Sequence, residues 1–254
     1  MSEAISNLEI FDRQWPAWVD MKVHGPASRW LRSLIRFQLG SIPNPECIRS
    51  ILDVGCGEGT ITRCLAEWLP ETQVVGIDFS EAGILCAQSR YKRNNLRFIH
   101  DESSQELGRS YDLVTAFEVL EHVEEWETLL RRIAHSAQQF VLLSFPTGRM
   151  RSFEKAMGHY RNFKRGEVER FMSGCGFKPA AAWYAGFPFF SPLYRNLCDF
   201  IQPASASLVT GTYGIRRRLL SRVIYCFFRF LSTRRRGGDQ FCGLFARASV
   251  GTES

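Results

Sequence analysis

Three glycines at alternate positions follow the first strand-like run of the sequence. Ile51–Val54 has the length of a buried strand, and a helical pattern begins soon after Gly55, Gly57 and Gly59. Because glycines have no side chains, the atoms of a ligand can approach the backbone closely there. Asp78 ends the next strand-like run, nineteen residues after Gly59, where a carboxylate can accept hydrogen bonds from two ribose hydroxyls. Together these residues indicate a site for an adenosine-type ligand.

Two other interpretations of this loop are weaker. A dinucleotide-binding loop of the nicotinamide or flavin enzymes places its third glycine one position later, where this chain has Thr60. A glycine turn without a ligand leaves the acid at the end of the second strand unexplained. We therefore favour an adenosine-type ligand that is not a dinucleotide.

Short apolar runs alternate with helical patterns through the middle of the chain and predict the scaffold that positions the loop. The strand-like runs are Ile51–Val54, Gln73–Ile77, Leu96–Ile99, Tyr111–Ala116 and Phe140–Ser144. They are separated by helical patterns at Ile61–Leu69, Glu81–Arg93 and Trp126–Ala137. This alternation predicts an α/β fold with a mostly parallel sheet that helices cover on both faces. Ligands of such sheets bind at the carboxyl ends of the strands.

The remaining segments frame this core. We expect an amphipathic helix at 26–40, a helix at 165–173, a sixth strand at 177–184 and a closing strand at 240–247. The chain then divides into an N-terminal helical cap (1–45), a Rossmann-like core (46–184), an aromatic and arginine-rich insertion (185–238) and a closing strand with a tail (239–254). Because the insertion is too long for an ordinary loop, it needs structure of its own.

The insertion carries the excess positive charge. The 254 residues have a formal charge of +6, and the segment between Gly211 and Gly238 contributes eight arginines with no lysine and no acid. On a helical wheel, the apolar residues between Leu219 and Leu231 fall into one half, and arginines occupy the other half and both ends. Such a helix either lies on an anionic membrane surface through residues 215–236 or packs on the core with a solvated arginine face.

The composition excludes several classes of protein. No uncharged apolar run reaches the roughly 18 residues of a spanning helix, and the acidic N-terminus lacks the pattern of a secretory signal. The eight cysteines have no Cys-x-x-Cys spacing, which indicates reduced thiols rather than disulfides or a zinc site. We expect a cytoplasmic protein, peripheral at the inner face of a membrane if the arginine-rich helix binds lipid.

From Ile51 to Phe177 the sequence resembles the class I S-adenosylmethionine-dependent methyltransferases, on the strength of the glycine loop and Asp78. The resemblance implies a seven-stranded sheet whose last strand is antiparallel, with S-adenosyl-L-methionine as the cofactor. It implies that the glycines contact the methionine part of the cofactor, Asp78 the ribose and Phe79 the adenine. The full set of implied cofactor-binding residues is Arg29, Asp53, Gly55, Cys56, Gly57, Gly59, Asp78, Phe79, Asp101, Glu102 and Phe117. For Arg29 the alternative is an ordinary exposed arginine on a helix.

A second motif follows the fourth strand. Phe117–Val123 contains a Glu-x-x-Glu-His pattern and looks like the corresponding segment of the ubiquinone-type O-methyltransferases and of the small-RNA 2′-O-methyltransferases. Both precedents methylate oxygen, and a hydroxyl acceptor must lose a proton as the methyl group arrives. We therefore predict His122 and Glu118 as catalytic residues, with His122 as the base. The alternative is that His122 caps a helix or orders the cofactor loop.

The same segment offers ligands for a divalent cation. Glu118, Glu121 and His122 supply oxygen and nitrogen atoms, and His159 sits where the RNA enzymes have a further histidine. Together they can bind Mg²⁺, which would lower the pKa of an acceptor hydroxyl. Since the pattern also occurs where no metal is needed, a metal-free site is our main expectation.

The sequence thus predicts an S-adenosylmethionine-dependent methyltransferase acting on an oxygen of a lipophilic or glycolipid-like small molecule. One alternative is an RNA methyltransferase, which a single basic patch without a recognisable RNA-binding module disfavours. A second alternative, from a different functional class, is a catalytically silent cofactor-binding protein that serves as a membrane or assembly partner.

Overall fold

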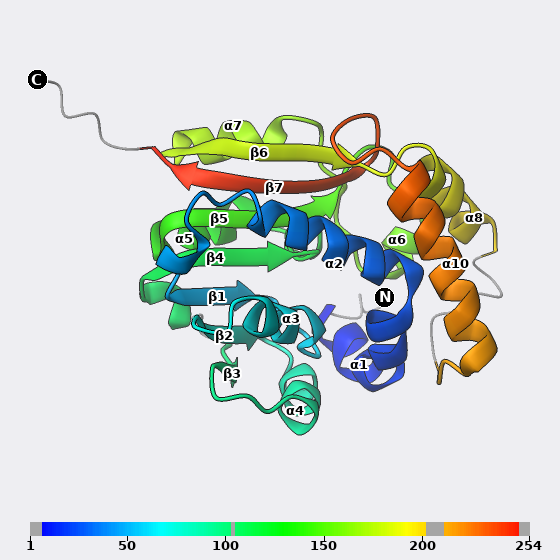
Figure 1. Ribbon diagram of the computed structural model, residues 1–254, viewed down its shortest axis with the longest axis horizontal. Coiled ribbons are helices and arrows are strands. Elements are labelled where there is room, and N and C mark those ends of the chain that lie inside the picture. Colours follow the sequence, from blue (N-terminus) through cyan, green and yellow to red (C-terminus); the bar gives the residue numbers. More distant parts are fainter. Residues whose placement is uncertain (1–6, 103–104, 202–210, 249–254) are drawn as a thin grey trace, which may run out of the picture.

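The computed structural model of the chain describes residues 7–102, 105–201 and 211–248, and Figure 1 shows them as one sheet flanked by helices. The seven strands lie in the order β3-β2-β1-β4-β5-β7-β6. They are β1 (Ser50–Val54), β2 (Gln73–Asp78), β3 (Leu96–His100), β4 (Tyr111–Phe117), β5 (Ala137–Pro146), β6 (Phe177–Ala185) and β7 (Gln240–Arg247). Strands β1 to β5 pair in parallel, whereas β7 is antiparallel to both of its neighbours. This confirms the predicted Rossmann-like fold with an antiparallel last strand.

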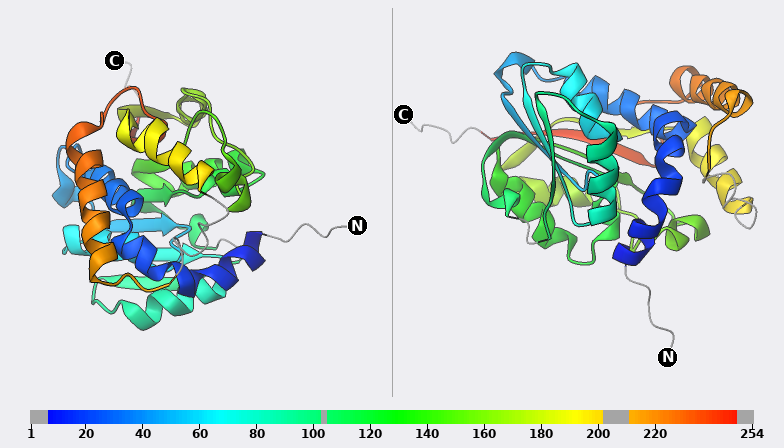
Figure 2. Two further views of the ribbon diagram at one scale, coloured as in Figure 1. Left: turned by 90° about the vertical axis from the view of Figure 1, so that its right-hand side faces the viewer. Right: turned by 90° about the horizontal axis from the view of Figure 1, so that it is seen from below.

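Helices cover both faces of this sheet. The helices are α1 (Asn7–His24), α2 (Pro26–Leu39), α3 (Thr60–Trp68), α4 (Glu81–Arg90), α5 (Trp126–Ser136), α6 (Ser152–Ala156), α7 (Glu167–Gly174), α8 (Arg195–Phe200) and α10 (Ile215–Leu231). Shorter helical turns are η1 (Pro45–Cys47), η2 (Glu106–Gly108), η3 (Leu120–His122) and η4 (Phe189–Tyr194). Buried side chains of α2, α3, α4 and α10 pack on one face, and those of α5 and α7 pack on the other (Figures 1 and 2).

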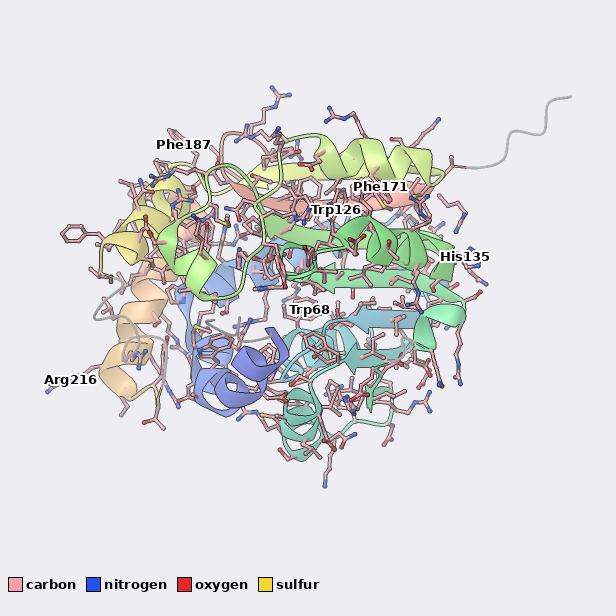
Figure 3. All side chains as sticks on the ribbon, turned by 180° about the vertical axis from the view of Figure 1, so that it is seen from behind. Trp68, Trp126, His135, Phe171, Phe187 and Arg216 are labelled. Atoms are coloured by element: carbon pink, nitrogen blue, oxygen red, sulfur yellow. The ribbon has the colours of Figure 1, made fainter. Side chains whose placement is uncertain are left out.

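Alternation along the central strands builds two hydrophobic layers. In β5, Val141 and Leu143 point to the layer that contains α5 and α7, while Leu142 points to the layer that contains α2 and α3. Successive side chains of a strand point to opposite faces, so a strand that is covered on both faces is apolar throughout. Trp126 and Phe171, labelled in Figure 3, close the first layer with ring centroids 5.3 Å apart.

Helix α1 lies within the predicted N-terminal helical cap, but the sequence analysis predicted no helix at its residues. Pro16 interrupts the segment, and its apolar residues form no clear helical stripe. The structure nevertheless buries Trp15, Trp18 and Val19 of this helix. Tertiary packing therefore stabilises a helix that the local pattern does not reveal.

Two predictions based on composition can be compared with the structure. All eight cysteines are free, as their spacing predicts. Within the part of the chain that the structure describes, no helix combines the length and the apolar character that crossing a bilayer requires.

The two ends of the insertion between β6 and β7 lie next to each other. The Gly186 amide donates to the Thr233 carbonyl at 2.7 Å, and the Gly238 amide donates to the Tyr184 carbonyl at 3.0 Å. These bonds join the two ends of the excursion directly beside the strands that it connects. They support residues 185–238 as a separate unit, and we retain the division into 1–45, 46–184, 185–238 and 239–254 as a proposal.

The close approach of these two chain segments depends on Gly238. A Cβ atom at this position would lie 1.8 Å from the carbonyl oxygen of Ala185. We expect Gly238→Ala to lower the free energy of unfolding by about 1–3 kcal/mol or more, because the backbone must shift to admit a methyl group. The measurement is urea unfolding followed by circular dichroism.

The matched control is Gly174→Ala at the end of α7, where an added Cβ meets no atom within 4 Å. We expect its effect to stay within about 0.5 kcal/mol. Equal effects for the two variants would contradict the proposed contact.

Candidate functional site

The glycine loop lies at the carboxyl ends of the central strands. Gly55, Gly57 and Gly59 all have positive φ angles, of 70°, 52° and 81°. The amides of Gly55 and Cys56 donate to the Ile77 carbonyl at 2.8 and 2.9 Å, which ties the loop to the end of β2. Gly59 then forms the left-handed N-cap of α3. The backbone thus takes the conformations that glycine adopts without strain, in the place that the sequence predicted.

The carboxylate of Asp78 organises this loop. One of its oxygens accepts a hydrogen bond from the Gly57 amide at 2.7 Å, and the other accepts one from the Ser80 amide at 2.9 Å. The residue is only 6% exposed, and burial raises the pKa of its carboxyl group against the opposing effect of the two amides. Each carboxylate oxygen retains a lone pair, so Asp78 can still accept bonds from a ligand.

Helix α1 covers the glycine loop. A Cβ atom at Gly57 would lie 2.4 Å from the indole ring of Trp15, and a Cβ at Gly83 would lie 3.0 Å from the same indole. The hydroxyl of Ser80 donates to Asp12 of α1 at 2.5 Å. Trp15 and Asp12 therefore belong to the surroundings of the predicted cofactor site. The signal that could have indicated them is the concentration of tryptophans near the N-terminus.

The residues predicted to contact adenine lie beside β3. Phe79 is partly exposed directly after Asp78, and Asp101 and Glu102 line an open cavity of about 440 Å³. The two oxygens of Asp101 accept bonds from the amides of Gln105 and Glu106 at 2.8 and 2.9 Å. Asp101 therefore shapes the turn at the cavity, and the exposed Glu102 leaves its carboxylate available to solvent.

Three residues predicted to bind the cofactor contact other parts of the protein in this structure. Both oxygens of Asp53 accept bonds from threonine hydroxyls, Thr62 of α3 and Thr115 of β4, each at 2.7 Å. Arg29 donates to the His24 carbonyl at 3.1 Å, at the junction of α1 and α2. Phe117 is buried in the layer that contains α2. These contacts hold elements of the scaffold together.

The tip of β4 contains an unusual backbone conformation. Among the described residues other than glycine, Glu118 alone has a positive φ, of 57°. Its carboxylate accepts bonds at 2.8 Å from the Ser144 hydroxyl of β5 and from the Gln240 side chain of β7. Burial raises the pKa of this carboxyl group. Sequence reasoning missed Ser144 and Gln240, because no local pattern shows that β5 and β7 flank the tip of β4.

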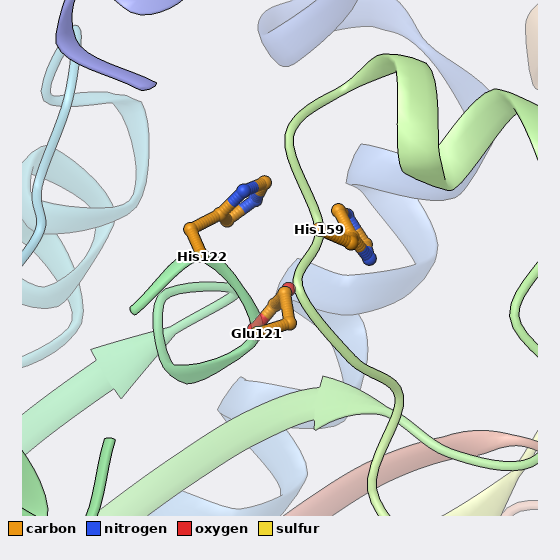
Figure 4. A group of neighbouring side chains, drawn as sticks. All are labelled: Glu121, His122 and His159. Carbon is orange, nitrogen blue, oxygen red and sulfur yellow. The ribbon is translucent and has the colours of Figure 1, made fainter. Parts of the chain in front are cut away.

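The turn after Glu118 brings three further side chains together (Figure 4). Glu121 and His122 lie on η3, and His159 comes from the loop after α6; one potential ligand atom of each lies within 4.8 Å of the others. Glu121 is fully buried, and neither of its carboxylate oxygens has a hydrogen-bond partner within the described residues. The rings of His122 and His159 meet edge to face at 4.5 Å. Glu118 lies outside this group, so three of the four residues considered as ligands for a cation come together.

Burial determines the protonation of this cluster. It lowers the pKa of both imidazoles, and His159 adds to the effect on His122, whose pKa falls to about 3. Both rings are therefore neutral near pH 7. The Nδ1 atom of His122 lies 3.2 Å from the Gly158 carbonyl and donates to it, which leaves Nε2 with a lone pair. Burial and the nearby Glu118 raise the pKa of Glu121.

Comparison with protein families identifies the domain. Residues 52–139 match the family model described as a methyltransferase domain, on a sheet whose strand order and antiparallel seventh strand are given above. This central segment of the chain is therefore a methyltransferase domain.

Curated relatives match part of this chain. A malonyl-[acyl-carrier protein] O-methyltransferase of Bacillus cereus is 27% identical over 121 residues, which cover 47% of this chain and 44% of the relative. A ubiquinone biosynthesis O-methyltransferase of Pseudomonas savastanoi is 32% identical over 88 residues, 33% of this chain and 37% of the relative. The matches thus span less than half the length of these relatives.

Solved structures share the fold of this chain over most of its length. The magnesium protoporphyrin IX methyltransferase of Synechocystis with bound S-adenosylhomocysteine aligns with a TM-score of 0.57 at 18% identity, over 91% of this chain and 86% of that one. A phosphoethanolamine N-methyltransferase of Haemonchus contortus in complex with S-adenosyl-L-methionine gives 0.56 at 14% identity, over 98% and 59%. At these identities the likeness concerns the fold alone.

The burial of Asp53 has a measurable effect on stability. Burial raises the pKa of its carboxyl group from 3.8 to about 6, so the folded protein holds this proton more tightly than the unfolded chain does. Protonated Asp53 therefore makes its full contribution to the free energy of unfolding below about pH 4, and this contribution is lost as the pH rises through 6. Relative to Asp53→Asn, we expect the free energy of unfolding of the wild type to fall by up to about 3 kcal/mol from pH 4 to pH 7.

Urea unfolding of the two proteins at several pH values between 4 and 7 measures this difference. A difference that does not vary with pH would show that Asp53 is ionised in the folded and unfolded states alike.

Proposed function

We propose that this chain transfers the methyl group of S-adenosyl-L-methionine to an oxygen atom of a small-molecule acceptor. The observation that carries the proposal is the hydrogen bond from the Gly57 amide of the glycine loop to the Asp78 carboxylate. This bond lies at the carboxyl ends of β1 and β2, within a methyltransferase domain. The names of two relatives, a malonyl-[acyl-carrier protein] and a ubiquinone biosynthesis O-methyltransferase, support oxygen as the acceptor atom.

The residues of the glycine loop fit this cofactor. Positive φ angles at Gly55 and Gly57 turn the chain without side chains in the way, so the methionine part of the cofactor has room beside the backbone. Asp78 would accept bonds from the ribose hydroxyls with its remaining lone pairs. Phe79 and the cavity beside Asp101 would take the adenine. When bound, the cofactor supplies a methyl group on a positively charged sulfur.

The acceptor would enter near the tip of β4, where η3 and His159 lie. The role of the chain there is to hold an acceptor oxygen in line with the methyl group and to remove its proton. The neutral imidazole of His122 has one nitrogen that can accept that proton when Nδ1 donates to the Gly158 carbonyl. Its lowered pKa reduces its proton affinity, however, so His122 without help would be a weak base.

A divalent cation on Glu121, His122 and His159 would offer an alternative to this base: His122 would then be a ligand, and the cation would lower the pKa of the acceptor hydroxyl so that its proton could pass to water. The three groups fit a metal, because a fully buried carboxylate without a hydrogen-bond partner lies beside two neutral imidazoles. Two nitrogens and one carboxylate suit a transition ion such as Mn²⁺ or Zn²⁺ better than Mg²⁺, which prefers oxygen ligands. We therefore propose this three-residue set in place of the four-residue magnesium site, with the metal lowering the pKa of the acceptor hydroxyl.

Replacement of Asp78 tests the cofactor. We expect Asp78→Ala to weaken S-adenosyl-L-methionine binding at least tenfold, because charge-assisted hydrogen bonds contribute about 1.5–3 kcal/mol each. Isothermal titration calorimetry measures the affinity, and circular dichroism checks the fold.

The matched control is Asp112→Ala, which removes another strand carboxylate that accepts two backbone amides, those of Arg49 and Ser50. Asp112 lies near the start of β4, at the opposite edge of the sheet. Unchanged affinity in Asp78→Ala would remove the central support for the proposal.

Metal binding has its own test, independent of turnover. We expect chelator-treated protein to bind Mn²⁺ in calorimetry and Glu121→Gln to lose at least tenfold in affinity, because the neutral amide cannot replace an anionic ligand. His135→Asn, on the exposed end of α5, is the control and should bind as the wild type does. If the chelator-treated protein shows no binding of Mn²⁺ or Zn²⁺, the cluster holds no metal.

The acceptor class can be found by incubation with methyl-labelled cofactor and separate lipid, RNA and small-molecule fractions. Label in the small-molecule or lipid fraction on an ether or ester oxygen is the expected result. Label in RNA alone would contradict the proposed acceptor.

A further inference from the structure

Exposed apolar side chains are concentrated in the insertion. Fourteen large hydrophobic residues are exposed in the described parts of the chain, and eleven of them lie between Phe187 and Leu231. Phe200 of α8 is 85% exposed and Phe230 of α10 is 74% exposed. The eleven are Phe187, Leu193, Leu197, Phe200, Ile215, Leu219, Leu220, Val223, Phe227, Phe230 and Leu231. Such a concentration of exposed apolar side chains in one segment is typical of an interaction site.

Helix α10 has an inner and an outer apolar face. Phe228 is buried, and its ring meets those of Phe190 and Tyr194 at 5.4 and 5.1 Å. Ile224 packs on the same layer of the core. The single apolar half expected from the helical wheel therefore divides in two, because Phe228 and Ile224 anchor the helix while Leu219 and Val223 face away from the core.

Arginines border the outer face. Arg216, Arg218 and Arg222 are exposed on α10, and Arg235 and Arg236 are exposed just after it. Figure 3 shows Arg216 extending away from the body of the protein at the end that also holds Phe187. The segment 211–238 contains no acid that could neutralise these charges. The outer face is therefore both apolar and strongly cationic.

This combination selects one kind of partner. If a second copy of the chain paired through the same face, its arginines would meet like charges, which opposes association. An anionic bilayer offers phosphate groups to the arginines and an apolar interior to the leucines and phenylalanines. We propose that the outer face of α10, together with the exposed residues of α8, docks on an anionic membrane surface.

The docking face lies at the end of the molecule that holds the candidate site. In Figure 1 the arrowheads of β1, β4 and β5 point toward the side where α1, α8 and α10 lie, and Figure 2 shows α8 and α10 together at this end. If the proposed methyl transfer is correct, docking would bring the acceptor entrance close to the bilayer, where an amphiphilic acceptor is concentrated. The docking itself does not depend on that function.

The test is sedimentation of the full chain with vesicles of phosphatidylcholine alone or mixed with phosphatidylglycerol. We expect partition into anionic vesicles to exceed that into neutral vesicles at least about tenfold at low salt and to decline as salt rises. A variant with Leu219→Ser, Val223→Ser and Phe230→Ser should lose most of the binding. A variant with Arg216→Gln, Arg218→Gln and Arg222→Gln should lose the preference for anionic vesicles.

Two controls match these variants. Leu85→Ser removes an exposed leucine of α4, and Arg49→Gln with Arg97→Gln and Arg170→Gln removes three exposed arginines elsewhere. Both should bind vesicles as the wild type does. Affinity for S-adenosyl-L-methionine, measured in parallel, should be equal in all variants, which separates loss of docking from failure of the proposed function.

Two outcomes would overturn the proposal: the wild type stays in the supernatant with anionic vesicles at low salt, or the serine variant abolishes self-association instead of vesicle binding. If the serine variant fails to fold, the glutamine variant decides, and a glutamine variant that keeps the full preference for anionic vesicles would contradict the proposal.

Discussion

A single buried carboxylate fixes the geometry of the cofactor region. Asp78 accepts hydrogen bonds from the backbone amides of Gly57 and Ser80. These bonds join the turn after β1 to the turn after β2. Burying a charged group without donors is costly, and two amides supply the donors, one of them from Gly57 in its positive-φ conformation. The interaction that satisfies the charge therefore also shapes the loop before a ligand arrives, which reduces the ordering that binding requires.

The tip of β4 depends on a different constraint. A positive φ at Glu118 costs free energy, of order 1–3 kcal/mol, and bonds from Ser144 and Gln240 hold the residue in place. The sharp turn directs Glu118 back toward β5 and β7 and sends Glu121 and His122 toward His159. The two glutamates of the motif thus have different neighbours, although their spacing in the sequence suggests one shared site. Glu118 is bound by Ser144 and Gln240, whereas Glu121 lies beside the two histidines.

Much of this architecture could be predicted from the sequence. The strands were evident because strands covered on both faces are apolar throughout, and the glycine loop and Asp78 were evident because their spacing is local. Helix α1 was missed because Trp15 is stabilised by contacts with Gly57 and Gly83, which lie far away in the sequence. The division of α10 into two faces was missed for a related reason. A helical wheel shows that Phe228 and Leu219 are apolar, but only the position of Phe190 decides which of them is buried.

The position of Trp15 links the N-terminal helix to the cofactor region. Its indole lies against Gly57 and Gly83, and Asp12 of the same helix accepts the bond from Ser80. A ligand that changes the conformation of the loop near these residues must also change the free energy with which α1 packs on the loop. By linkage, the packing of α1 changes the binding free energy of that ligand by the same amount. A ligand that strengthens these contacts would protect α1 from proteolysis and from amide hydrogen exchange, and deletion of α1 would weaken that ligand by the same free energy. Affinity at the glycine loop would therefore be coupled to the docking of the N-terminal helix that covers the loop.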